Sequence, residues 1–206
     1  TMSFRIKQAV VLGSGIMGSG IACHLANIGV SVLLLDLPAK ESKNRNAPAA
    51  EALAKAIKSS PALLYDKKFA SRISTGNFED DLSKVAEADW IIEVVVERAD
   101  IKQALYEKIE LYRKPGTLIT SNTSGIPISL LAKGRSDDFR AHFCGTHFFN
   151  PVRYMALLEI IPHAETSPDV IEFFMHYGDQ WLGKKTVLCK DSPAFIANRI
   201  GFFSGN

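Results

Sequence analysis

The sequence has few cysteines, no long apolar segment and almost no excess of charge. Its three cysteines are too far apart for a disulfide framework or a zinc site. Lysine and arginine number 24 against 22 acidic residues, giving a net charge of +2 without a basic run. Apolar runs such as residues 30–35 are too short to cross a bilayer, and residues 1–7 lack the apolar core of a signal peptide. We expect a cytoplasmic protein with no metal site, no membrane insertion and no nucleic-acid partner.

Strand-like and helix-like segments alternate through the first 120 residues. The chain has 206 residues, 47% of them hydrophobic, which is enough to bury a sizeable core. Strands are predicted at 7–12, 30–35, 71–76, 89–96 and 117–120, and helices at 16–28, 49–58 and 101–113. This repetition favours an α/β fold with a doubly wound, mainly parallel Rossmann-type sheet.

The regular alternation of strands and helices ends in the second half of the chain. Strands are predicted at 141–149 and 156–161 with only a turn around Asn150-Pro151 between them, so they should be antiparallel. A helix at 168–181, a strand at 185–189 and a helix beginning near Pro193 follow. We expect a nucleotide-binding domain over 1–190, and over 191–206 the start of a helical domain whose remainder is missing.

A glycine-rich turn joins the first predicted strand to the first helix. Residues 13–18 read G-x-G-x-x-G: Gly13, Ser14, Gly15, Ile16, Met17 and Gly18. Asp36 ends the next strand, where a carboxylate accepts hydrogen bonds from ribose hydroxyls and repels a 2′-phosphate. The helix start supplies N–H groups for the pyrophosphate. Because Asp36 repels a 2′-phosphate and no arginine follows it, the pattern predicts NAD rather than NADP. FAD shares the fingerprint, and a glycine turn beside a solvated aspartate is the alternative without a ligand.

Two glutamates belong to the predicted strand 89–96 and the residue after it. Glu97 is predicted to end the strand at the carboxyl edge, where such sheets bind ligands. The alternative is a surface residue that leads into the next helix. Glu93 lies deeper on the same face and would be costly there unless paired, and its role stays open.

Catalytic chemistry is suggested by residues from three segments. Glu159 lies within an aliphatic run, LLEII, so it should be desolvated and should seek a cation. If the second strand folds back beside the first, His147 comes within reach, and the pair would suit proton removal from an alcohol. Ser124 and Asn150 would position the alcohol and the nicotinamide. Alternatively, His147 is a satisfied core residue, Ser124 caps a helix and Asn150 only makes a turn.

Several motifs occur together along the chain. Besides the fingerprint with Asp36, they are Glu97 with Lys102, SNTS at 121–124, HFFNP at 147–151, Glu159, and CKDSPAFIANR at 189–199. With them the chain resembles the L-3-hydroxyacyl-CoA dehydrogenases over essentially its whole length, and HFFNP and SNTS are the more specific motifs. Members interconvert 3-hydroxyacyl-CoA and 3-ketoacyl-CoA with NAD, a step of fatty-acid β-oxidation.

The resemblance implies roles for individual residues. His147 would be the base and Glu159 its orienting partner, with Ser124 and Asn150 contacting substrate and nicotinamide. It further implies that Glu97 and Lys102 help to hold NAD and that Asn198 belongs to the active site. An acyl-CoA substrate, and a homodimer or multidomain parent assembled through the helical domain, are also implied.

The chain also departs from the family pattern. Ala194 stands where the family usually has glycine, and residues 37–70 align poorly with the helical hairpin that touches CoA in the family. Lys55 and Lys58 could still contact CoA phosphates. Two other functions stay open: a dehydrogenase of a different hydroxy acid, such as a sugar acid, and a non-catalytic nicotinamide-binding module.

Overall fold

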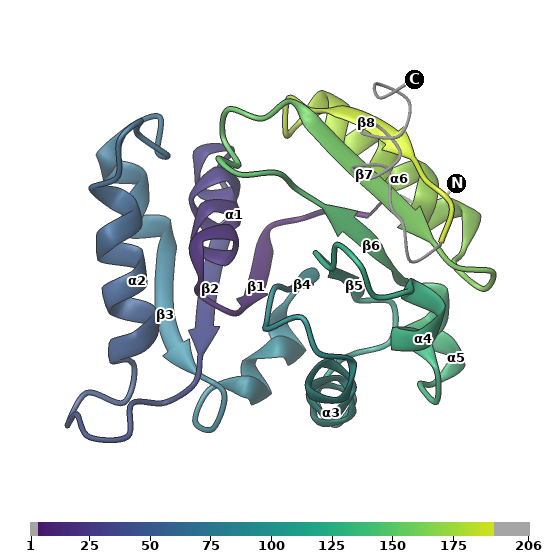
Figure 1. The fold of residues 1–206 in the computed structure, drawn as a ribbon, viewed down its shortest axis with the longest axis horizontal. Coiled ribbons are helices and arrows are strands. Elements are labelled where there is room, and N and C mark those ends of the chain that lie inside the picture. Colours follow the sequence, from purple (N-terminus) through teal and green to yellow (C-terminus); the bar gives the residue numbers. More distant parts are fainter. Residues whose placement is uncertain (1–3, 192–206) are drawn as a thin grey trace.

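An eight-stranded sheet runs through the computed structural model, which describes residues 4–191 (Figure 1). The strands are β1 (Gln8–Leu12), β2 (Ser31–Asp36), β3 (Ile73–Asn77), β4 (Trp90–Glu93), β5 (Leu118–Ser121), β6 (Phe143–His147), β7 (Leu157–Pro162) and β8 (Lys185–Leu188). Their order is β3-β2-β1-β4-β5-β6-β7-β8. The chain therefore leaves β1 toward one edge and crosses back to β4 on the other side, the arrangement that opens a crevice at the carboxyl ends of β1 and β4.

The strand directions confirm the predicted mixed sheet. The six strands β1 to β6 are mutually parallel. Strand β7 pairs antiparallel with β6, and β8 is parallel to β7. In the β6–β7 pair, His147 lies directly opposite Glu159. The predicted fold-back of the second strand is confirmed, and with it the approach of these two residues.

Helices cover both faces of the sheet (Figure 1). They are α1 (Ile16–Asn27), α2 (Ala47–Ile57), α3 (Ala99–Glu110), α4 (Ile128–Ala132), α5 (Asp137–Ala141) and α6 (Pro168–Gln180), with short 3-10 turns at Lys67–Arg72 and Leu82–Glu87. Helices α1, α2 and α6 pack with alternate strand residues such as Val11 and Trp90. Helices α3, α4 and α5 pack on the opposite face with Val10 and Ile91. The central strands β1, β4, β5 and β6 are therefore buried on both faces, which explains their continuous apolar runs.

Strand β4 is shorter than predicted. It ends at Glu93 rather than at Val96, so the expectation that Glu97 ends the strand is wrong. Both neighbours stop there: Leu12 is the last β1 residue in register with β4, and Ser121 is the last of β5. After a last bond from the Val94 amide to the Leu12 carbonyl, residues 94–97 leave the sheet as a loop, and Glu97 lies in this loop.

Strand β6 is also shorter than predicted. It spans Phe143–His147 rather than 141–149, because Ala141 ends helix α5 and Phe148 begins the loop to β7. The predicted helix from Pro193, and with it Ala194 and Asn198, lies outside the described residues. Within residues 4–191, none of the helices is long and apolar enough to span a membrane.

Candidate active site

The three glycines of the turn between β1 and α1 lie in different surroundings. Gly13 has φ of +110°, and a Cβ there would lie 2.6 Å from the Val94 carbonyl oxygen. A Cβ on Gly18 would lie 1.8 Å from the carbonyl oxygen of Gly13. A Cβ on Gly15, by contrast, would meet no protein atom within 4 Å and would stand in open space at the start of α1. Gly13 and Gly18 therefore allow the turn to close, and Gly15 leaves the outer surface of the turn clear.

The start of α1 suits an anion. Gly15 is the N-cap, no side chain caps the helix, and the first turn contains no acidic residue. Exposed N–H groups and the positive end of the helix dipole attract phosphate at such a position. The turn therefore fits the pyrophosphate of a dinucleotide.

Asp36 lies beside this turn at the end of β2. Its Oδ2 accepts a 2.9 Å hydrogen bond from the Ser14 amide and another bond from the Ser14 hydroxyl, and Oδ1 accepts a 2.7 Å bond from the Leu37 amide. A carboxylate has about four acceptor positions, so this one can still accept a ribose hydroxyl. Ser14 thus fixes Asp36 beside the phosphate turn, as a dinucleotide site requires.

Glu97 binds the loop that follows β5. Its carboxylate accepts bonds from the Thr123 hydroxyl at 2.6 Å, the Ser124 amide at 2.8 Å and the Ser124 hydroxyl at 3.1 Å. Burial alone raises the pKa of Glu97, but these bonds and the nearby Lys102 charge together lower it below its ordinary value. Glu97 is thus a surface residue before α3, as the alternative had it, but its carboxylate is also tied to the loop after β5.

Ser124 does not cap the following helix. The N-cap of α4 is Pro127, and the amides of Ile128 and Ser129 donate instead to the carboxylate of Asp191 at 2.6 and 2.7 Å. Ser124 is exposed beside the cleft, with its hydroxyl directed to Glu97. The helix-capping alternative for Ser124 is excluded.

His147 and Glu159 form a buried pair across β6 and β7. Nδ1 of His147 lies 2.6 Å from Oε1 of Glu159, and the two residues are 6% and 0% exposed. The Phe149 ring lies 4.5 Å from the imidazole, centroid to centroid, and the Cys189 thiol contacts Oε2 of Glu159 at 3.9 Å. Because the carboxylate accepts, Nδ1 carries the hydrogen and the lone pair is on Nε2.

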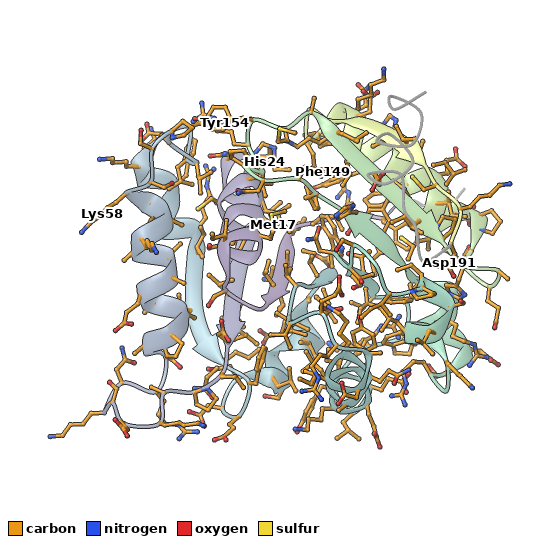
Figure 2. The ribbon with its side chains drawn as sticks, in the orientation of Figure 1. Met17, His24, Lys58, Phe149, Tyr154 and Asp191 are labelled. Atoms are coloured by element: carbon orange, nitrogen blue, oxygen red, sulfur yellow. The ribbon has the colours of Figure 1, made fainter. Side chains whose placement is uncertain are left out.

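One cleft of about 520 Å³ brings most of these residues together. Met17 of α1 and Phe149 of the loop after β6, both labelled in Figure 2, line it. The other residues lining it that the sequence predicted are Gly15, Ile16, Gly18, Glu97, Lys102, Ser124, His147 and Asn150. Gly13 and Glu159 do not line the cleft: Gly13 packs against the Val94 carbonyl, and Glu159 holds His147 from behind. Ser14 and Asp36 lie on the β2 side of the glycine turn. The cleft is thus at the carboxyl edge, where β1, β4, β5 and β6 end.

Asn150 also lines a second cleft, of about 470 Å³, between α1, α2 and residues 59–63. Lys55 lies on its wall, together with Ser59 and Ser60. Lys58 does not line it and extends into solvent from the end of α2 (Figure 2). Of the two lysines considered for CoA phosphates, only Lys55 is beside the shared Asn150.

Two supporting residues were not singled out from the sequence. Asn122 accepts a 2.8 Å bond from the Phe148 amide and so ties the loop after β5 to the residue next to His147. Lys184 is buried, and its Nζ donates to the carbonyls of Val152 and Met155 in the loop that carries Asn150. Burial lowers the pKa of Lys184 to about 8. Asn122 lies within the SNTS motif, but the position of Lys184 depends on packing that no local pattern shows.

Comparison with known proteins identifies the family. The family description "3-hydroxyacyl-CoA dehydrogenase, NAD binding domain" matches residues 8–192. A "probable 3-hydroxyacyl-CoA dehydrogenase" of Bacillus subtilis is 50% identical over 98% of this chain, which spans 27% of that relative. A Rickettsia felis relative, whose name refers to a trifunctional enzyme of a fatty acid oxidation complex, is 43% identical over 98% of this chain, which spans 28% of it.

A solved structure agrees with these relatives. The (S)-3-hydroxybutyryl-CoA dehydrogenase of Ralstonia eutropha is 33% identical and superposes with a TM-score of 0.75, covering 95% of this chain and 68% of its own. This chain therefore belongs to the 3-hydroxyacyl-CoA dehydrogenase family, of which it is the NAD-binding domain.

Proposed function

We propose that the protein containing this chain oxidises L-3-hydroxyacyl-CoA to 3-ketoacyl-CoA with NAD. The 2.6 Å contact between Nδ1 of His147 and Oε1 of Glu159, at the wall of the dinucleotide cleft, is the observation that carries this proposal. A histidine held by a buried carboxylate keeps one tautomer and one ring orientation. Neither property is needed by a module that only binds nicotinamide.

The cofactor would lie along the carboxyl edge of the sheet. The glycine turn would hold the pyrophosphate, Asp36 the adenine ribose, and Glu97 with Lys102 the region toward the nicotinamide. The chemistry that NAD supplies when bound is acceptance of the hydride that leaves C3 of the substrate.

The proton and the hydride of the substrate go to different acceptors. His147 takes the hydroxyl proton at Nε2, and Glu159 stabilises the resulting imidazolium through Nδ1. Ser124 and Asn150, which line the same cleft, orient the alcohol and the nicotinamide. Asn198, outside the described residues, would join this site, as the resemblance implies.

The acyl-CoA would approach through the second cleft. Asn150 lines both clefts, and Lys55 offers a positive charge to CoA phosphates. Because the family relatives are much longer than this chain, we further propose that a helical domain beyond it completes the acyl pocket and mediates dimer or multidomain assembly.

A substrate comparison on the full-length protein tests this function. We expect NADH formation with 3-hydroxybutyryl-CoA and a loss of kcat/KM of at least about 100-fold with free 3-hydroxybutyrate, because remote binding energy is lost. Faster oxidation of a sugar acid than of the thioester would establish the other dehydrogenase function. NAD binding without turnover on any hydroxy acid would leave only the non-catalytic module.

A further inference from the structure

A buried carboxylate lies beneath the dinucleotide cleft at the end of β4. Glu93 is 0% exposed and is absent from the cleft wall. It accepts bonds from Lys102 Nζ at 2.6 Å, the Ser121 hydroxyl at 2.7 Å and the Val95 amide at 2.9 Å, and also one from the Tyr106 hydroxyl. From the sequence we expected only that this glutamate is paired, and in the structure its carboxylate accepts hydrogen bonds from four donors.

Lys102 connects this buried carboxylate to the cleft. Lys102 is only 2% exposed, yet it lines the cleft. Besides Glu93, Nζ donates to the Val95 carbonyl at 3.0 Å and lies 3.5 Å from Oε1 of Glu97. An ammonium so far from water needs a carboxylate at close range. The nearer and fully buried carboxylate is that of Glu93, whereas the side chain of Glu97 is 42% exposed.

Glu97 extends this chain of contacts to the substrate side. Its two oxygens accept bonds from Thr123 and Ser124, which end the segment 122–124 that lines the cleft. One continuous path thus runs from Glu93 through Lys102 and Glu97 to Ser124. It connects the loops after β4 and β5, in addition to the backbone bond from the Asn122 amide to the Glu93 carbonyl and the bond from the Ser121 hydroxyl to the Glu93 carboxylate.

We propose that Glu93 is a positioning residue of the NAD site, which acts by fixing Lys102 and, through it, Glu97 and Ser124. Glu93 itself touches neither cofactor nor substrate. The proposal requires NAD to occupy this cleft, but it is independent of the substrate and of the role of His147. A failure here would therefore leave the proposed reaction untouched, and a failed substrate assay would leave this inference untouched.

The competing role for Glu93 is purely structural. In that case it would satisfy Tyr106, Ser121 and the β4 end, and its loss would lower stability without a specific effect on the cofactor. Tyr106 provides a matched control because its hydroxyl donates to the same carboxylate from within the α3 packing, and Tyr106 does not line the cleft. Tyr106→Phe removes a bond to Glu93 but keeps both the carboxylate and Lys102.

A double-mutant cycle on this chain separates the two roles. NAD affinity is measured by calorimetry for Glu93→Gln, Lys102→Met, the double variant and Tyr106→Phe, each with its thermal midpoint. We expect Glu93→Gln to raise the Kd for NAD about tenfold, and to raise it no further when Lys102 is already Met. Tyr106→Phe should lower the thermal midpoint and leave the Kd within about twofold.

The Ser124 amide provides a second readout. Its proton resonance reports the bond to Glu97, so Glu93→Gln should move it although the two residues make no direct contact, and Tyr106→Phe should not. A Kd unchanged by Glu93→Gln would overturn the proposal, as would an equal loss in the Lys102→Met background. If Glu93→Gln alone does not fold, comparison of the double variant with Lys102→Met decides, because removing both charges leaves no unpaired buried ion.

Discussion

His147→Gln should lower kcat of the full-length dehydrogenase by about 10²- to 10⁴-fold while leaving NAD affinity nearly unchanged. Glutamine preserves a polar side chain of similar reach but cannot take a proton at neutral pH. The imidazole lies at the cleft wall beside Phe149, not at the glycine turn, so its loss should spare the pyrophosphate and ribose contacts. Steady-state kinetics with 3-hydroxybutyryl-CoA, alongside calorimetric NAD titration, measures both quantities.

Two further variants control this experiment. Glu159→Gln keeps the imidazole but removes the charge that orients it, so kcat should fall less than in His147→Gln. His176→Gln changes an exposed histidine on α6, distant from the cleft wall, and should retain full activity. Wild-type kcat in His147→Gln would refute the proposed base, whatever the other variants do.

Gly15→Ala and Gly18→Ala should fail in different ways. At Gly18 the new methyl would lie 1.8 Å from the Gly13 carbonyl oxygen, a backbone atom that cannot move without opening the turn. We expect a loss of stability at or above the usual cost of overpacking, about 1–3 kcal/mol. At Gly15 the methyl meets no protein atom, so the fold should hold. It would instead occupy the space through which the pyrophosphate approaches, and NAD affinity should fall at least about tenfold.

Thermal unfolding and NAD titration together distinguish these outcomes. Gly15→Ala should keep a near-wild-type thermal midpoint and lose NAD binding, whereas Gly18→Ala should unfold at a clearly lower temperature. Gly29→Ala, at a positive φ in the turn after α1 with open space around its Cβ, controls for backbone strain alone. Unimpaired NAD binding by Gly15→Ala would show that the pyrophosphate does not cross this turn.

Local patterns were enough to predict the sheet. The apolar runs at β1 and β2, and the glycine turn between β1 and α1, indicate both the elements and their parallel order, because doubly buried strands carry no alternation. Strand ends were less predictable. The apolar run 94–96 continues the pattern of β4, so the sequence predicts a longer strand. The strand ends at Glu93 because its neighbours β1 and β5 end at Leu12 and Ser121, and this pairing cannot be read from a local pattern. Helices α4 and α5 are too short to show a helical period.

The site residues were predictable where a motif lies next to a turn or strand that the sequence also predicts. The fold-back of β7 on β6 could be inferred from the turn at Asn150-Pro151, and it places Glu159 opposite His147 as expected. The network around Glu93 could not be inferred, because its donors Lys102, Tyr106 and Ser121 come from separate elements that meet only in the folded core. Lys184 was missed for the same reason, since its acceptors are backbone carbonyls that no sequence pattern identifies.

Calorimetric titration of this 206-residue chain with NAD and then with NADP tests the central claim most directly. We predict NAD binding in the micromolar range and at least about 100-fold weaker NADP binding, because the Asp36 carboxylate repels a 2′-phosphate. Equal affinity for both would contradict the assignment of Asp36 to the ribose. Binding of neither by the folded chain would contradict the cleft at the carboxyl edge as the dinucleotide site.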